Sequence, residues 1–289
     1  MDVFHTRTQH LSHYDHYHVT LASINAVTGI DHFKLSSSRL ETLVVHQRDR
    51  SKNVGSDWYH YMLRVCPLQL QRLELHNHRF VVAPRWTNTA PPPTTIVFID
   101  PFWVPPPARP QHDEVVPQLV LERSSPWSLD DLQILRVYQA LTTLRLLSKL
   151  PYSEKSHFEQ GPDANDDFPS VLLPSVNTLS LTGEIPHQIL GALNLPALKT
   201  IEIRNHTDRH SMGVGHLQNT TLHHNVTKLK VFIACRSCRE AHSYCCWWTC
   251  DFAAVLIATL KLRTIVVSAS MLSHLPQTFV PDTANLVVC

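Results

Sequence analysis

The side chains with the clearest capacity for chemistry lie in one short segment, residues 235–250. It holds the candidate zinc ligands Cys235, Cys238, His242, Cys245 and Cys250. Thiolate and imidazole groups are the ligands that structural zinc sites use. Cysteine is also a small hydrophobic residue that is often buried, and Trp247 and Trp248 lie in the same segment. Because the cysteines beyond the single Cys-x-x-Cys pair lack the standard zinc spacing, we expect burial and no stoichiometric zinc.

Catalytic chemistry has less support in the sequence. The phosphate-binding motifs G-x-x-x-x-G-K-[ST] and G-x-G-x-x-G are missing, as is the G-x-S-x-G turn of hydrolases. With 20 histidines and 24 acidic residues, neighbouring His and Asp side chains arise by chance, and catalytic triads are defined by geometry. We therefore expect a non-catalytic protein without a cofactor. An α/β enzyme of unknown reaction is the alternative.

The overall composition argues against several classes of partner. The formal net charge is +1, which gives no bulk attraction for nucleic acid or for an anionic membrane. The N-terminus lacks the apolar core of a signal peptide. The longest apolar stretch, around 252–268, contains Lys261 and Arg263 and is too short to span a bilayer. We expect an intracellular protein, in the cytoplasm or nucleus, whose cysteines are reduced.

A recurring phrase of apolar residues indicates the scaffold that must position these side chains. The clearest copies are Val176-x-x-Leu179-x-Leu181 and Leu198-x-x-Ile201-x-Ile203. Further copies are Leu40/Leu43/Val45, Leu70/Leu73/Leu75, Pro93/Ile96/Phe98, Val116/Leu119/Leu121, Leu141/Leu144/Leu146, Val226/Leu229/Val231 and Leu262/Ile265/Val267. The shorter intervals between copies match leucine-rich repeats, and the longer ones indicate repeats with insertions.

This phrase predicts an α/β fold, an irregular leucine-rich-repeat-like solenoid with a curved parallel sheet of about nine strands. In each strand alternate residues point to opposite sides, so the apolar pair faces inward and its neighbours face outward. Return segments should cover the inward side. Helices are expected after Ser128, a good N-cap, and after Pro186, which suits the first turn. The alternative is a set of ordinary buried strands in an α/β domain.

The chain divides into two parts on this interpretation. Residues 1–36 are polar and His-rich, and we expect a tail or a cap there. Residues 37–289 form the repeat region, with insertions near 87–110, 153–168, 204–225 and 235–250. The first of these is rich in proline, which predicts irregular structure, and the acidic segment 153–168 is expected to be an exposed loop.

The outward-facing strand positions are the expected partner-binding surface, because solenoids of this kind bind through their concave sheet. Four of them, Val97, Ile99, Val120 and Leu147, would form an apolar band. Towards the C-terminal half, Arg145, Arg204, Lys228, Lys230 and Phe232 lie on the same face against Glu202. We expect a protein partner with an apolar anchor and an acidic flank. As an alternative, the Pro-rich loops fold over the band and hide it.

The segment 173–203, LPSVNTLSLTGEIPHQILGALNLPALKTIEI, resembles the leucine-rich-repeat part of the F-box family of mushroom-type fungi; 70–80 and 255–268 have the same style. The resemblance implies the substrate-recognition part of an F-box ubiquitin ligase subunit. It also implies a ubiquitin-ligase adaptor as partner if an F-box is present elsewhere. The Leu-Pro-x-Glu core of the F-box is not seen in this sequence. A truncated relic with no independent function is a further alternative.

Overall fold

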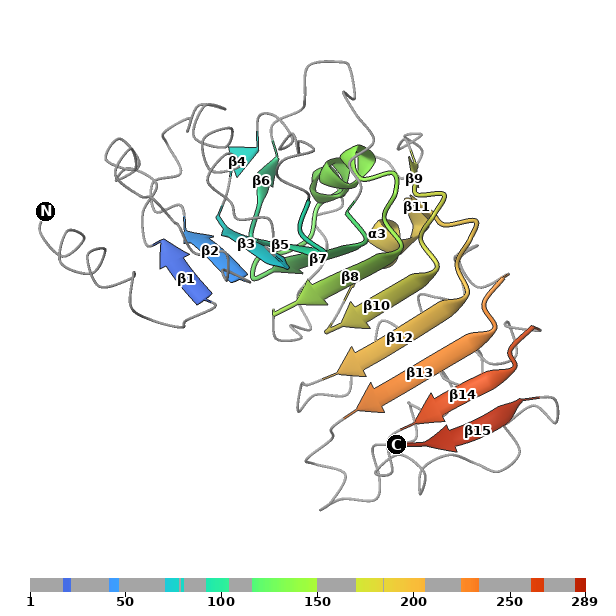
Figure 1. Ribbon diagram of the computed structural model, residues 1–289. Helices are drawn as coiled ribbons and strands as arrows, with labels where there is room; N and C mark the ends of the chain where they lie inside the picture. Colours follow the sequence, from blue (N-terminus) through green and yellow to red (C-terminus); the bar gives the residue numbers. More distant parts are fainter. Residues whose placement is uncertain are drawn as a thin grey trace, which may run out of the picture.

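The computed structural model describes residues 18–21, 42–46, 71–77, 79–80, 92–103, 116–149, 170–183, 185–205, 225–233, 261–267 and 284–289. Eleven strands form one sheet, in the order of the chain and all parallel (Figure 1). They are β1 His18–Leu21, β2 Thr42–His46, β3 Arg72–His76, β5 Thr95–Ile99, β7 Gln118–Arg123, β8 Thr143–Ser148, β10 Thr178–Thr182, β12 Thr200–Asn205, β13 Lys228–Ile233, β14 Thr264–Val267 and β15 Asn285–Val288.

The nine predicted copies of the phrase are nine adjacent strands, β2 to β14 in this sheet. Their register keeps equivalent residues side by side: Leu144 pairs with Leu179, Leu179 with Ile201, and Ile201 with Leu229. The copy that begins with proline is β5, and its Ile96 pairs with Leu119. Each copy of the phrase therefore contributes one strand to the parallel sheet.

The inward-facing residues form one continuous core. The members of the phrase that the structure describes are almost fully buried, including the first residue of each phrase, such as Val176, Leu198 and Leu262. Parallel strands stack these side chains in columns, and a second layer covers them. The burial of long columns of Leu, Ile and Val is the main source of stability in such an arrangement.

The second layer is short and irregular, and it lies on the core side of the sheet (Figure 1). It consists of the 3-10 helix η3 Leu129–Val137, helix α3 His187–Gly191, and two pairs of two-residue strands. These pairs are β4 Arg79–Phe80 with β6 Phe102–Trp103, and β9 Val171–Leu172 with β11 Leu193–Asn194. Leu132 and Leu135 of η3 are buried in the same core as the strands.

Both expected helices are present, but their details differ from the prediction. After Ser128 the chain forms a 3-10 helix, and the Ser128 backbone N–H donates to Asp131 Oδ2 at 2.8 Å. Pro186 caps α3 instead of entering its first turn, and the helix ends at Gly191 because β11 follows. The helix therefore stops before Leu193 and Asn194, which pair with β9.

Two strands of the main sheet and one strand of the Pro-rich segment were not predicted. β1 lies in the N-terminal segment that was expected to be a tail or cap, and β15 ends the sheet at the opposite edge. Each lacks the first apolar residue of the phrase, because His16 and Thr283 occupy that position. Phe102–Trp103 forms β6 inside a segment expected to be irregular. The insertion expected at 204–225 begins later, because Arg204 and Asn205 belong to β12. Residues 206–224, the acidic segment 153–168 and the cysteine segment 235–250 lie outside the described residues.

Candidate binding face

The flank face is the side of the main sheet opposite the core, made of the first, third and fifth residues of each strand. Parallel register turns each of these positions into a row that crosses the sheet. The first row is rich in threonine: Thr42, Thr95, Thr143, Thr178, Thr200 and Thr264. The charged side chains are distributed over the first, third and fifth rows, with Arg72 and Lys228 in the first. The third row also contains Val44, Val97, Val120 and Val266, so the charged side chains lie on a face of mixed polar and apolar residues.

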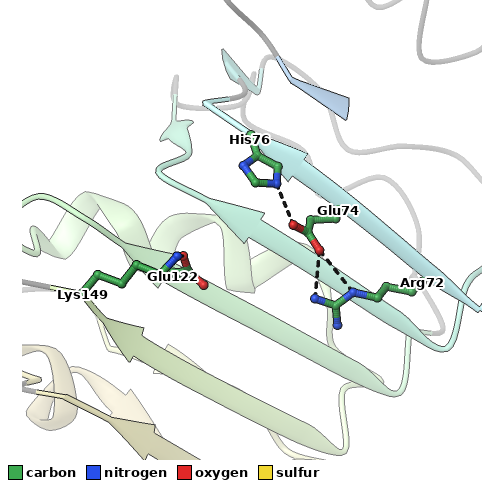
Figure 2. A network of polar contacts seen from close by, with 5 residues as sticks. All are labelled: Arg72, Glu74, His76, Glu122 and Lys149. Atoms are coloured by element: carbon green, nitrogen blue, oxygen red, sulfur yellow. Dashed lines mark hydrogen bonds and ion pairs between the residues drawn. The ribbon is translucent and has the colours of Figure 1, made fainter. Parts of the chain in front are cut away.

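On β3, three side chains of the flank face form a hydrogen-bonded group (Figure 2). Arg72 donates to Glu74 Oε2 from Nη2 at 2.9 Å and from Nε at 3.2 Å. His76 Nε2 lies 2.6 Å from Glu74 Oε1. Burial would raise the pKa of Glu74, but the hydrogen bonds and positive charges of His76 and Arg72 outweigh it and lower that pKa below 4.5. Glu74 is therefore held as a carboxylate.

A second ion pair joins two neighbouring strands. Lys149, directly after β8, contacts the carboxylate of Glu122 on β7 (Figure 2). Glu122 is buried, whereas the Lys149 side chain remains mostly exposed. The pair neutralises a carboxylate that would otherwise be desolvated without a partner. Sequence reasoning did not place Lys149 on this face, although it follows Leu147 by two residues and so points to the same side.

The third group lies at the C-terminal half of the face. Glu202 accepts hydrogen bonds from Arg204 Nε at 2.5 Å and from Lys230 Nζ at 3.2 Å. The guanidinium carbon of Arg204 also lies 4.9 Å from the centre of the Phe232 ring, a cation–π distance. Burial would raise the pKa of Glu202, but Arg204 and Lys230 lower it below 4.5. Four of the predicted site residues are therefore in mutual contact.

Two cations of the flank face differ from these groups. Within the described part of the chain, Arg145 and Lys228 make no side-chain hydrogen bond or ion pair, and Arg145 is exposed. The carboxylates of the face, Glu74, Glu122 and Glu202, are each paired already. The described cations are twice as numerous as the carboxylates: Arg72, Arg145, Lys149, Arg204, Lys228 and Lys230. The face therefore carries an excess of positive charge.

The predicted apolar band is less open than expected. Val97 is 1 % exposed and Val120 is 8 % exposed, whereas Ile99 and Leu147 are half-buried. The two valines lie side by side in the third row. They do not present an open apolar surface in this structure, so the excess of charge is the more prominent property of the face.

A histidine next to a carboxylate is a component of many general-base sites, and His76 with Glu74 has this arrangement. In the register, the neighbours of His76 are His46 on β2 and Ile99 on β5. Within the described ranges, no group of three or more His, Cys, Asp or Glu is arranged to hold a metal ion. The candidate zinc ligands of 235–250 are not among those residues.

The pKa of Glu202 leads to a testable dependence of stability on pH. A carboxyl whose folded pKa lies below its unfolded value stabilises the fold above that unfolded value, and this contribution is lost as pH falls through the folded pKa. We expect Glu202→Gln to lower the free energy of unfolding by about 1 kcal/mol at pH 7. The difference from the native protein should shrink on acidification below about pH 4.5, the ordinary Glu value. Urea denaturation at a series of pH values measures it.

Asp131 of η3 provides the matched control, because its shift has the opposite sign. Burial raises the pKa of Asp131 above 3.8, and the Ser128 N–H and the Arg123 charge only partly oppose this. Its charged form is therefore a cost to the fold that is relieved as pH falls towards the unfolded value. Asp131→Asn should not reproduce the pH profile of Glu202→Gln. Equal profiles for both variants would contradict the assigned pairing of Glu202.

None of the helices in the described ranges has the length and apolar character that crossing a bilayer requires. Comparisons of the chain with protein-family models, with curated proteins and with solved structures gave no match. The assignment of function therefore depends on the geometry and charge of the flank face.

Proposed function

We propose that this chain is a non-catalytic interaction protein, a leucine-rich-repeat-like solenoid that binds a protein partner through its flank face. The observation that carries the proposal is the ordered parallel sheet, in which each phrase adds one strand and one set of outward side chains. Solenoids bind through such repeated surfaces because the core is complete without the outward residues. The outward side chains that are exposed or half-buried, such as Arg145 and Lys228, are thus available for a second protein.

The charge of the flank face defines the kind of partner. Glu74, Glu122 and Glu202 are neutralised by cations of the same face. Arg145 and Lys228 have no such carboxylate among the described residues, and a carboxylate of a partner would pair these charges. An acidic segment laid across β8 to β13 would do so. The hydroxyls of Thr143 and Thr200 lie along the same path and can donate further hydrogen bonds, whereas that of Thr178 already donates to Asn177 Oδ1 at 2.9 Å.

Charge reversal tests this proposal directly. Arg145→Glu should weaken binding of an acidic partner by about tenfold or more, because attraction is replaced by repulsion at a position with no internal ion pair to lose. Lys228→Glu should act in the same direction. Proximity labelling in cells identifies the partner, and titration calorimetry with that purified partner measures the change.

The matched control is Arg136→Glu, which makes the same charge change on η3, an element of the core-side layer. It should leave the affinity unchanged. All three variants should retain the melting temperature of the native chain within a few degrees, since the three side chains are exposed or half-buried. Equal affinity for Arg145→Glu and native protein would reject the flank face as the binding surface.

The resemblance of 173–203 to the repeat region of F-box proteins adds a narrower proposal, a substrate receptor of a ubiquitin ligase. The observation in its favour is the regular unit from β10 through α3 and β11 to β12, whose apolar residues are buried throughout. Co-purification with a ligase adaptor would support it. Partner binding without the adaptor would leave the interaction role and remove the ligase role.

A further inference from the structure

Ser180 of β10 is a buried residue of the flank face, and its hydroxyl has no hydrogen-bond partner among the described residues. The residue is 4 % exposed and belongs to the third row, on the side opposite the core residues Leu179 and Leu181. A buried hydroxyl without a hydrogen bond lowers the stability of a fold. Serine at this position therefore requires a physical reason.

The other buried side chains of the third row are either apolar or paired. Glu202 of β12 is paired with Arg204 and Lys230. Four other strands have valine at this position: Val44, Val97, Val120 and Val266. An apolar side chain is thus compatible with the row and would avoid the penalty of an unpaired hydroxyl. A hydrogen-bond partner on another molecule would explain the serine.

The neighbours of Ser180 in the register define the chemistry of that partner. On β8 the neighbour is Arg145, which is exposed and makes no ion pair within the described ranges. On β12 it is Glu202, whose two carboxylate oxygens already accept from Arg204 and Lys230. Adjacent strands lie about 4.8 Å apart, so a hydroxyl donor and a guanidinium donor are side by side. A carboxylate accepts from both and balances the single charge of Arg145.

We propose that Ser180 and Arg145 together bind one Asp or Glu carboxylate of the protein partner, with the hydroxyl donating to one oxygen and the guanidinium to the other. This inference rests on the proposed function, because it assigns the point at which an acidic segment is anchored on the flank face. The residues beside Ser180 on this face of β10, Thr178 and Thr182, have short side chains. Ser180 Oγ is not fully enclosed, so a carboxylate can reach it.

The first measurement requires no partner. Ser180→Ala should leave the melting temperature unchanged or raise it, because the substitution removes an unpaired polar group and breaks no hydrogen bond. Glu202→Gln should lower the melting temperature, because the partners of Glu202 lie within the chain. A clear fall for Ser180→Ala would show that its hydroxyl is bonded inside the chain, and it would overturn the proposal.

The second measurement is the binding of a fluorescently labelled deca-glutamate peptide to the full chain, followed by fluorescence anisotropy. Ser180→Ala should weaken this binding by about tenfold, the effect of losing a hydrogen bond to a charged group, and Arg145→Glu should weaken it at least as much. The matched control is Thr178→Val, which removes a hydroxyl of the same strand that already donates to Asn177. It should bind with native affinity. A deca-glutamine peptide should not bind.

The outcomes separate this inference from the proposed function. Weaker binding by Arg145→Glu together with native affinity in Ser180→Ala would keep an acidic partner on the flank face and reject the role of Ser180. Equal binding of deca-glutamine and deca-glutamate, or no binding of deca-glutamate by the native chain, would overturn the carboxylate site. The proposed function would still have its own test, the affinity of Arg145→Glu for the purified partner.

Discussion

Leu179→Asp is expected to unfold the chain. Leu179 is fully buried and lies between Leu144 and Ile201 in the core column that runs across the sheet. A carboxylate there would be desolvated without a partner and would leave a gap in the packing. The cost, roughly 3–5 kcal/mol or more, approaches the whole stability of a typical domain. Soluble expression, circular dichroism and urea denaturation of the variant measure the effect.

Thr178→Asp is the control, because it introduces the same charge one residue earlier and on the opposite side of the strand. Thr178 is half-buried on the flank face and faces Thr143 and Thr200 across the sheet. Its replacement should change the free energy of unfolding by less than about 1 kcal/mol. Similar stability of the two aspartate variants would show that Leu179 does not face the core.

Gly183→Ala is the second substitution with a large expected effect. Gly183 follows β10 with φ +74°, in the left-handed region where alanine is strained. A Cβ atom at this position would lie well inside van der Waals contact with the carbonyl oxygen of Ser148, so the backbone would have to shift. We expect a loss of about 2–4 kcal/mol, measured as a fall in melting temperature of many degrees.

Gly191→Ala separates this strain from the general effect of adding a methyl group. Gly191 ends helix α3 and has no atom within 4 Å of an added Cβ. Alanine should leave stability unchanged or raise it by up to about 1 kcal/mol, because it restricts the unfolded chain. A large loss at position 191, or none at position 183, would contradict the turn that the structure places after β10.

The equivalent turns after β3 and β5 also have a residue with positive φ, but that residue is not glycine. Asn77 and Asp100 adopt φ 54° and 48° directly after their strands. Asn and Asp tolerate this region better than other side chains, and the Asp100 carboxylate accepts a hydrogen bond from the Ser124 N–H at 2.6 Å. The strand ends are therefore fixed by local turn chemistry, which the apolar phrase does not encode.

The strands of the sheet could be predicted from the sequence because one physical requirement repeats. A strand in this sheet needs an apolar pair with one intervening residue and a further apolar residue three positions before. Nine segments satisfy it, and even Pro93 is accommodated since it precedes β5. The strands β1 and β15 were not predicted, because His16 and Thr283 stand where the phrase requires its first apolar residue.

The flank face was predictable as a set of positions but not as a set of contacts. Strand alternation places Glu74, Arg145 and Glu202 on one side without any knowledge of rotamers. Which cation pairs with which carboxylate depends on long side chains that reach along a strand, as Arg72 does, or across strands, as Lys149 and Lys230 do. Burial of Val97 and Val120 likewise depends on their surroundings and not on their own sequence position.

The most direct test of the central claim is site-specific photo-crosslinking of the chain to its purified protein partner. A photo-reactive residue would replace Leu147 or Thr182 on the flank face, and, as matched positions, Gln133 or Arg136 on η3 at the core-side layer. The account predicts crosslinks from the flank positions, reduced by Arg145→Glu, and none from η3. Crosslinks from η3, or equal yields from both sides, would contradict the flank face as the binding surface.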